Sequence, residues 1–315
     1  MQTTSHLVMI RPATFRKNEE TATNNLYQRE LAGLSADEVL DRALAEFDGF
    51  VAALEAAGAQ VHVVEADPEV DAPDALFPNN WISFHVDGRV GLYPMFAPNR
   101  RVERREDVVF DLELRGFGVE EVVDFTEFEA HDVFLEGTGS LVLDRANRRA
   151  YAALSERTHL DGLRAFCEAF DFEGIPFTAN QTGPSGRTPI YHTNVMMSVG
   201  TAFAAICLEC IDDEEERAMV REALEADGKE IVELSEDQIN HFAGNLLEVQ
   251  SADGSPLIAL SSQAYQALTP DQRTALERHG RLVHAPLETI ETCGGGSARC
   301  MLAENFLPLT TANPF

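Results

Sequence analysis

The sequence predicts an α/β fold built from five repeated units within one domain, residues 1–315. Polar segments followed by a hairpin signal recur every 50–57 residues, and segments with the pattern of capped helices lie between them. Because no Pro- or Ser-rich linker separates the repeats, we expect one domain with cyclic pseudosymmetry and not two domains in series. The alternative is an ordinary α+β domain whose hairpins recur by coincidence.

Each hairpin signal consists of a polar segment, a short apolar strand, a turn and a second strand. In the first one, "LFPNNWISFHVDGRVGLYPM" (76–95), the Asp87-Gly88 pair favours a tight turn. The layout recurs at 133–154, 189–209 and 241–261, with turns at 145–147, Gly200 and Asp253-Gly254, and it begins again at 293–309. The polar segments, called leads below, lie near residues 79, 136, 192, 245 and 295.

Helical segments fill the intervals between the hairpins. The first, 35–58, begins at Ser35 as a capping residue, carries acidic residues in its first turn and ends at Gly58. Its apolar residues recur with helical spacing, and a short strand is expected next, at 62–67. The segments 213–228 and 269–280 predict similar helices. Each unit is therefore roughly a strand, a hairpin, a helix and a strand.

The charge balance is strongly acidic, with 53 Asp and Glu residues against 24 Lys and Arg and a net charge of −29. A surface this negative is a poor partner for nucleic acid. Only Lys17 and Lys229 are lysines. An acidic, lysine-poor surface suits a halophilic protein, because concentrated salt screens the self-repulsion. GC-rich codon usage is the alternative explanation for the missing lysines.

The sequence gives no sign of a membrane or secretory segment. The N-terminal "HLVMI" patch is too short for a signal peptide, and no stretch approaches the roughly 18 apolar residues of a membrane span. We therefore expect a cytoplasmic protein without a membrane partner.

The cysteines and histidines do not predict a disulfide framework or a metal site. Five cysteines are few and irregularly spaced, and the "CLEC" pair, Cys207 and Cys210, lies in an apolar run expected to be a strand, so core thiols are the simplest interpretation. The histidines show no paired metal-ligand spacing, and the glycines form no nucleotide-binding motif. No cofactor is expected.

The leads carry the residues with chemical potential. If the repeats are equivalent, their leads converge on one end of the pseudosymmetry axis. They contribute Asn79, Asn80, Glu136, His192, Asn194, Asn245 and Cys300. A thiol, an imidazole and a carboxylate in one pocket are the elements of nucleophilic catalysis. The glycines before the cysteine, including Gly296, allow close backbone approach and N–H donors for a developing oxyanion. Taken singly, a lone cysteine or histidine is more often a core residue.

Three motifs resemble one known superfamily. "GGGSARCM" (294–301) is similar to the C-terminal nucleophile motif of arginine deiminases, "LEGTGSLVL" (135–143) to their Glu-Gly-Gly-Asp segment, and "YHTNVMM" (191–197) to their His-x-Asp segment. The chain thus resembles the guanidine-modifying, or pentein, superfamily from about Met9 to Leu309, and most of all its citrulline-utilisation hydrolase, or amidinotransferase-like, branch. The resemblance implies a five-bladed α/β propeller of ββαβ units.

The resemblance also implies roles for single residues. Cys300 would be the nucleophile, His192 the group that protonates the leaving amine and then activates water, and Glu136 the residue that positions substrate and imidazole. Cys293 lies outside the motif and would be structural. The expected substrate contacts are Asn79, Asn80, Asn194 and Gly296.

The resemblance is incomplete at two positions that hold the guanidinium in arginine deiminases. Their two aspartates correspond to Asn80 and Asn194 here, which keep hydrogen-bonding capacity without the charge. A neutral ureido group would lose less attraction than a guanidinium, so we expect a cysteine-dependent hydrolase of citrulline or an arginine derivative that works through a covalent thioenzyme.

The substrate carboxylate needs a cation, and arginine suits a bidentate contact. Arg100 and Arg101 fall where the family's first blade carries such an arginine. Arg187 lies on a Gly- and Pro-rich segment, 184–192, that we expect to act as a lid. Solvated surface arginines are the alternative for each.

Other functions stay open at this stage. An amidinotransferase would replace water by an amine, and an arginine deiminase or dimethylargininase would use the same residues. A non-catalytic binding propeller, such as the ribosome anti-association factors, would not need Glu136, His192 and Cys300 together. Papain-like proteases place cysteine before histidine, opposite to this chain. The expected partner is a small molecule, with a homodimer left open.

Overall fold

The computed structural model describes residues 1–183 and 186–310, and its strands form five three-stranded sheets of one topology. In each sheet the first strand is antiparallel to the middle strand, and the middle strand is parallel to the third. Four sheets are continuous in sequence: β3 (Ile82–Phe84), β4 (Arg89–Leu92) and β5 (Glu121–Asp124); β6 (Val142–Asp144), β7 (Arg149–Ala153) and β8 (Glu173–Phe177); β11 (Met197–Val199), β12 (Phe203–Ile206) and β13 (Glu230–Glu233); β14 (Leu247–Gln250), β15 (Pro256–Ser261) and β16 (Arg281–Ala285).

The fifth sheet joins the two ends of the chain. Its first strand is β17 (Ala303–Glu304), which pairs antiparallel with β1 (His6–Arg11), and β1 pairs parallel with β2 (Gln60–Glu65). The unit that begins at residue 293 is therefore completed by the N-terminal segment. Strand pairing across almost 300 positions gives the chain the same ββαβ unit five times.

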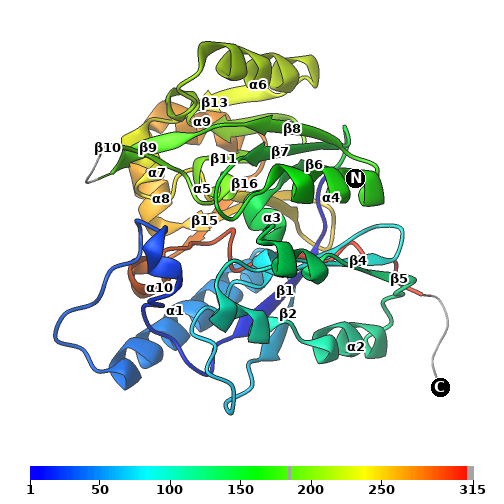
Figure 1. Cartoon of the computed structure of the whole chain (residues 1–315), viewed down its shortest axis with the longest axis vertical. Coiled ribbons are helices and arrows are strands. Elements are labelled where there is room, and N and C mark those ends of the chain that lie inside the picture. Colours follow the sequence, from blue (N-terminus) through cyan, green and yellow to red (C-terminus); the bar gives the residue numbers. More distant parts are fainter. Residues whose placement is uncertain (184–185, 311–315) are drawn as a thin grey trace.

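A helix connects the middle and third strands of each unit, because two parallel neighbours need a crossover. These helices are α1 (Ala36–Ala56), α2 (Glu106–Leu114), α4 (Leu160–Phe170), α6 (Glu214–Ala226) and the pair α8 (Ser262–Ala267) and α9 (Pro270–Glu277). Figure 1 shows α1, α2 and α6 at the periphery of the molecule. The predicted helices over 35–58, 213–228 and 269–280 agree with α1, α6 and α9.

Local sequence explains where the longest helix begins and what it buries. The Ser35 hydroxyl accepts the N–H of Glu38, whose carboxylate accepts the N–H of Ser35, a capping box. The buried face of α1 is Val39, Ala43, Phe47, Phe50 and Leu54. Full burial of a Leu or Phe side chain is worth roughly 1.5–3 kcal/mol, so this face holds the helix on its sheet.

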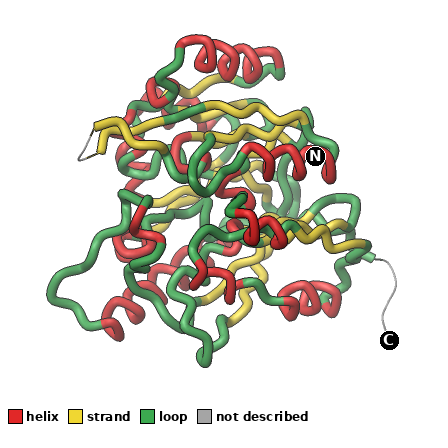
Figure 2. The backbone as a smooth tube through the Cα atoms, in the orientation of Figure 1, coloured by secondary structure: helices red, strands yellow, loops and turns green. Residues whose placement is uncertain are grey.

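Two features differ from the repeat pattern. The run around Cys207, expected to be a continuous strand, stops at Ile206, and a 3-10 turn, η5 (Leu208–Cys210), follows. A separate hairpin, β9 (Asn180–Gly183) and β10 (Gly186–Pro189), projects beyond β8 (Figure 2). Within the described part of the chain, no helix combines the length and the apolar character needed to cross a bilayer.

Candidate active site

The five leads form short turns that precede the first strand of each sheet. They are η2 (Pro78–Asn80), α3 (Gly137–Ser140), α5 (Thr193–Met196), the turn at 242–245 and the turn at 297–301 that follows α10 (Glu288–Gly294). Side-chain hydrogen bonds connect each lead to the next one. Thr138 Oγ1 donates to the carbonyl of Asn79 (3.3 Å), and Thr193 Oγ1 to that of Ser140 (2.6 Å).

The connection continues to the last lead. Asn245 Nδ2 donates to the carbonyl of Asn194 (2.9 Å), and Asn245 Oδ1 accepts the backbone N–H of Arg299 (3.0 Å). The leads predicted from the sequence repeat therefore meet, although up to 220 residues separate them.

Glycines in the second lead permit this close approach. A Cβ on Gly137, which has a φ of +45°, would lie 2.3 Å from the carbonyl oxygen of Asn79. A Cβ on Gly139 would lie 2.5 Å from Asn80 Nδ2 and 2.8 Å from His192 Nδ1. The two glycines of "LEGTGS" thus let three leads pack without side chains between them.

Glu136 and His192 form a buried pair. Glu136 Oε2 lies 2.7 Å from His192 Nε2, and Glu136 Oε1 accepts the N–H of Phe96 (2.9 Å). Burial alone would raise the pKa of Glu136, but the Arg157 guanidinium (3.5 Å) and the contact with His192 hold it well below its usual range. Burial lowers the pKa of His192 to about 4, against the opposing effect of Glu136. At neutral pH the pair is a carboxylate and a neutral imidazole whose Nε2 donates to it.

The Cys300 sulfur is buried, and two amide groups face it. Asn245 Nδ2 lies 3.3 Å and Asn194 Nδ2 3.5 Å from Sγ. The thiol is 4% exposed and lines the same small cavity as His192. Cys300 and His192, 108 positions apart in the sequence, therefore line one small cavity.

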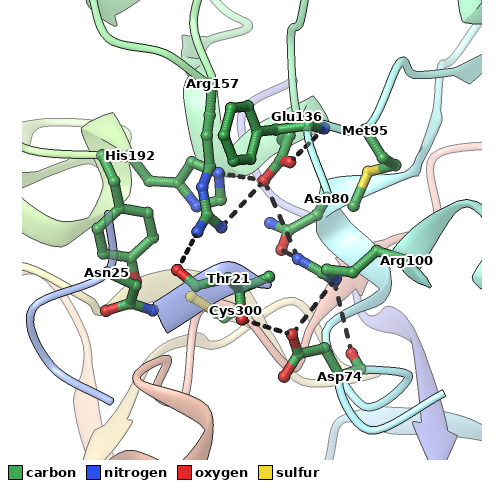
Figure 3. Close-up of polar contacts among 12 residues, drawn as sticks. Thr21, Asn25, Asp74, Asn80, Met95, Arg100, Glu136, Arg157, His192 and Cys300 are labelled. Atoms are coloured by element: carbon green, nitrogen blue, oxygen red, sulfur yellow. Dashed lines mark hydrogen bonds and ion pairs between the residues drawn. The ribbon is translucent and has the colours of Figure 1, made fainter. Parts of the chain in front are cut away.

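Two arginines and an aspartate complete the charged wall of the cavity. Arg100 contacts both carboxylate oxygens of Glu103 (2.9 and 2.8 Å) and donates to Asn80 Oδ1 (2.8 Å). Arg157 stacks on the ring of Tyr191, 5.0 Å from its centroid. Figure 3 shows Glu136 between Arg157, His192 and Arg100. Burial raises the pKa of Asp74, and its Oδ1 atom has no hydrogen-bond partner.

The segment between β1 and α1 covers this cavity. Gln28 Nε2 donates to the carbonyl of Gly294 (2.9 Å), and Asn25 Nδ2 to that of Gly295 (3.3 Å). Thr21 Oγ1 lies 3.2 Å from Asp74 Oδ2. The cavity is lined by Thr21, Asn25, Gln28, Asp74, Phe77, Asn80, Arg100, Arg157, Tyr191, His192, Gly294, Gly296 and Cys300.

The structure brings together most of the predicted site residues. Asn80, His192, Gly296 and Cys300 line the cavity, and Glu136 and Asn194 contact His192 and Cys300 directly. Asn79 is fully buried behind Asn80, whose Nδ2 donates to Asn79 Oδ1 (2.9 Å).

Two predicted arginines lie elsewhere. Arg101 is directed to the Met95 carbonyl (3.2 Å) and Glu129 (3.2 Å), because adjacent residues of the 3-10 helix η3 (Pro98–Glu103) face different sides. Arg187, on β10, contacts Asp212 (2.7 Å) and Glu236 (2.5 Å) at the surface. Neither lines the cavity. Of the expected lid, Pro184 and Ser185 lie outside the described residues.

Several residues that line the cavity were not predicted from the sequence. Asp74 and Arg157 belong to no lead, and Thr21, Asn25 and Gln28 come from a segment without periodic pattern. An arginine directly after a middle strand, as in "SERTHL" (155–160), is a weak local signal for Arg157. Across residues 1–183 and 186–310, no cluster of three or more His, Cys, Asp or Glu side chains is arranged to bind a metal ion.

Comparisons with known proteins agree with this architecture. ArgZ, an arginine dihydrolase from the ornithine-ammonia cycle in Cyanobacteria, superposes with a TM-score of 0.70 at 18% identity, over 97% of this chain and 41% of that chain. Unliganded AgrE gives 0.71 at 17% identity, over 95% and 39%. The chain thus spans about two fifths of these relatives. Dimethylarginine dimethylaminohydrolase, as an adduct with S-methyl-L-thiocitrulline, gives 0.61 at 14% identity, over 96% and 100%.

The N-terminal domain of ArgZ bound to substrate matches over nearly its whole length, with a TM-score of 0.69 at 18% identity, covering 96% of this chain and 99% of that domain. No curated protein sequence shows significant similarity. The model of one protein family, described as N,N dimethylarginine dimethylhydrolase, eukaryotic, matches residues 11–307. The chain therefore belongs to the N,N dimethylarginine dimethylhydrolase family, within the guanidine-modifying superfamily that its cysteine motif resembles.

Proposed function

We propose that the protein hydrolyses a C–N bond in the ureido or guanidino group of a free amino acid, with Cys300 as the nucleophile. One observation carries the proposal: Cys300 and His192 line one small cavity, and Glu136 lies 2.7 Å from the imidazole. This is the relation of nucleophile, base and orienting acid that covalent hydrolysis requires.

In the first half-reaction, His192 takes the proton of the Cys300 thiol through Nδ1, because Nε2 is occupied by Glu136. The thiolate attacks the carbon of the head group, forming an S–C bond. The C–N bond to the amine then breaks, and the imidazolium protonates that amine as it leaves. The carboxylate of Glu136 stabilises the imidazolium while it exists.

In the second half-reaction, water attacks the carbon of the thioenzyme and gives its proton to His192. The S–C bond breaks, and Cys300 leaves as a thiolate. With citrulline as substrate, the amine product is ornithine and the second product is carbamate, which decomposes to carbon dioxide and ammonia. An acceptor amine in place of water would make the reaction an amidinotransfer.

The charged wall of the cavity suits the α-amino acid end of the substrate. Arg100 and Arg157 are buried and line the cavity, so we assign them the α-carboxylate in place of Arg101 and Arg187. The unpartnered Oδ1 of Asp74 offers an acceptor for the α-ammonium group. These three residues would fix the substrate chain so that its head group reaches Cys300.

The amides around the sulfur favour a neutral head group. Asn80 and Asn194 stand where the superfamily's arginine deiminases carry aspartates, and neither amide supplies a negative charge. We therefore rank citrulline first. A guanidino substrate, as in dimethylargininase or arginine dihydrolase activity, is the second candidate, supported by the family membership and by the two carboxylates Glu136 and Asp74.

A substrate panel tests the proposal. The purified protein is assayed with citrulline, arginine, dimethylarginine, agmatine and succinylarginine, and amine and ammonia products are measured with and without an acceptor amine. The expected result is ornithine release from citrulline without an acceptor. Turnover confined to arginine or dimethylarginine would favour the second candidate, and no turnover with an intact fold would favour the binding propeller.

We also propose the finer architecture, in which the five sheets are blades of a five-bladed propeller that forms one catalytic domain, residues 1–315. The side-chain hydrogen bonds that connect each lead to the next one support this architecture. We propose further that the protein is halophilic, because its composition is acidic and poor in lysine, and that it is cytoplasmic, as the sequence leads us to expect. Melting curves in low and high salt test this: Tm is expected to rise with salt, and a constant Tm would contradict it. Light scattering in the same buffers reports whether a homodimer forms.

A further inference from the structure

We propose that Asn245, together with Asn194, forms an amide pair that stabilises Cys300 as a thiolate. This inference deepens the proposed function and rests on it, since it concerns the same sulfur. It assigns a catalytic role to the fourth lead, for which the mechanism above has no use.

The geometry around the sulfur is the first support. Asn245 Nδ2 lies 3.3 Å from Sγ and Asn194 Nδ2 3.5 Å, and both amide side chains are 1% exposed. Among the described residues, no other group donates a hydrogen bond to this sulfur. Two N–H dipoles in a water-poor site favour the charged form of the group that accepts them.

The orientation of the Asn245 amide is fixed by its other partners. Its Oδ1 accepts the Arg299 N–H (3.0 Å) and lies 3.7 Å from Sγ, which can donate to it as a thiol, and its Nδ2 also donates to the Asn194 carbonyl (2.9 Å). A primary amide nitrogen has two N–H bonds, so one serves the carbonyl and the other the sulfur. The flipped amide would place Oδ1 against a carbonyl oxygen and lose the Arg299 contact.

The turn that presents the sulfur is fixed as well. The Arg299 side chain donates to the Leu302 carbonyl (2.8 Å) and to Glu304 of β17 (2.6 Å). Asn245 therefore contacts a rigid turn and aims its donor before substrate arrives, as preorganised electrostatic stabilisation requires.

In the free protein, no cationic side chain among the described residues donates a hydrogen bond to the sulfur, so the donors that face it are neutral. His192 is neutral at pH 7, since burial lowers its pKa to about 4, and its Nε2 is directed to Glu136. Arg100 and Arg157 have their own partners in Glu103 and in Asn24. In the free protein, the amides of Asn245 and Asn194 are therefore the groups that stabilise a thiolate at Cys300.

The test is a spectroscopic titration of the Cys300 thiol in the free protein. Thiolate ultraviolet absorbance is recorded against pH, and the same curve from the matching Cys300→Ser protein is subtracted. Asn245→Leu removes both N–H donors of the Asn245 amide, keeps a side chain of similar size and adds no charge. The control is Asn79→Leu, which removes an equally buried amide of the first lead that does not touch the sulfur.

We expect Asn245→Leu to raise the pH midpoint of the Cys300 titration by at least one unit. At pH values below the midpoint this is a tenfold loss of thiolate. Asn79→Leu should leave the midpoint unchanged within a few tenths of a unit. The loss of kcat/KM in Asn245→Leu should recover at higher pH, which a merely structural role would not produce. An unchanged midpoint in folded Asn245→Leu overturns the inference. If that variant fails to fold, Asn194→Leu, which removes the other amide that faces the sulfur and adds no charge, must raise the midpoint, and an unchanged midpoint in it overturns the inference.

The titration is independent of turnover. If Cys300→Ser retained full activity, the proposed function would fail while the midpoint shift would still report on the amide pair. If Cys300→Ser were inactive and the midpoint did not move, only the role of Asn245 would fail.

Discussion

Cys300 and Cys207 are equally hidden from solvent but lie in opposite environments. Cys300 is 4% exposed and Cys207 0% exposed. Two amides and a charged cavity surround the first sulfur, whereas the second lies 3.2 Å from Cys210 Sγ within an apolar cluster. The contact with Cys207, together with burial, raises the pKa of Cys210 strongly. Burial therefore does not distinguish the proposed nucleophile from a core thiol, and the polar groups that face each sulfur do.

The same substitution at both sites should have opposite effects. Cys300→Ser removes the proposed nucleophile and should lower kcat by about 10⁴-fold or more, with Tm unchanged within a few degrees. Cys207→Ser buries a hydroxyl in an apolar cluster and should cost about 1–3 kcal/mol of unfolding free energy, with kcat retained. Steady-state assays and urea denaturation measure both. Full activity in Cys300→Ser would remove the basis of the comparison.

Glu136→Gln should produce the next largest loss. The variant keeps the shape and removes the charge that orients His192 and pairs with Arg157. We expect kcat to fall by about 10²–10³-fold. Glu129→Gln is the matched control, because Glu129 pairs with Arg104 away from the cavity. An equal loss in both variants would mean that general destabilisation, not the site, explains the effect.

Arg157→Lys tests the carboxylate contact. Lysine retains the positive charge but loses the planar, bidentate donor and the stacking on Tyr191, so KM should rise by about tenfold with a smaller change in kcat. Arg187→Lys, which alters a surface ion pair, should leave KM unchanged. If Arg187→Lys raised KM instead, the original prediction for the surface arginine would be restored.

Asn194→Asp should shift selectivity towards a cationic head group. Asn194 Oδ1 has no partner, so the added charge would stay available, and the ratio of kcat/KM for arginine over citrulline should rise about tenfold. Asn80→Asp should shift the ratio less, because Arg100 donates to Asn80 Oδ1 and would neutralise the charge. Equal shifts would show that Arg100 does not hold Asn80 in solution.

A pH effect on stability should distinguish the cavity from the apolar cluster. The pKa of His192 is lowered to about 4 in the folded protein, from 6.5 in the unfolded chain. Between pH 4 and 6.5 the unfolded chain therefore binds the His192 proton more tightly than the folded protein does. The full free energy of unfolding is present above pH 6.5, and part of it is lost as pH falls towards 4. His192→Gln should remove this loss, which is on the order of 1–3 kcal/mol. Urea denaturation at pH 7 and 4.5 measures it, and parallel curves for both proteins would contradict it.

The repeat could be predicted because its signals are local. Turn signals, capping residues and helical spacing predicted four hairpins and three helices that the structure contains. The fifth unit could be predicted only in part, since β17 pairs with β1 across the whole chain, a contact that no local pattern contains. The strand predicted through Cys207 was wrong beyond Ile206, where the chain turns although its residues remain apolar.

The site was predictable where chemistry and repeat coincide. Glu136, His192 and Cys300 lie in leads, and because the leads occupy equivalent positions in the repeat, their proximity could be predicted. Arg100 and Arg101 could not be separated by sequence, because one residue of helical rotation decides which side chain is buried. Asp74 and the residues of the covering segment lie outside every lead, and only tertiary packing brings them to the cavity.

Mass spectrometry of the protein during turnover can detect the covalent thioenzyme on Cys300 itself. Acid quenching within the first turnovers with citrulline should trap a carbamoyl group on the peptide that contains Cys300, and in His192→Ala this adduct should form and decay more slowly. The Cys300→Ser protein, quenched in the same way, should carry none. Steady turnover of citrulline with no adduct on Cys300 in either the native protein or His192→Ala, or an adduct on another residue, would contradict the account.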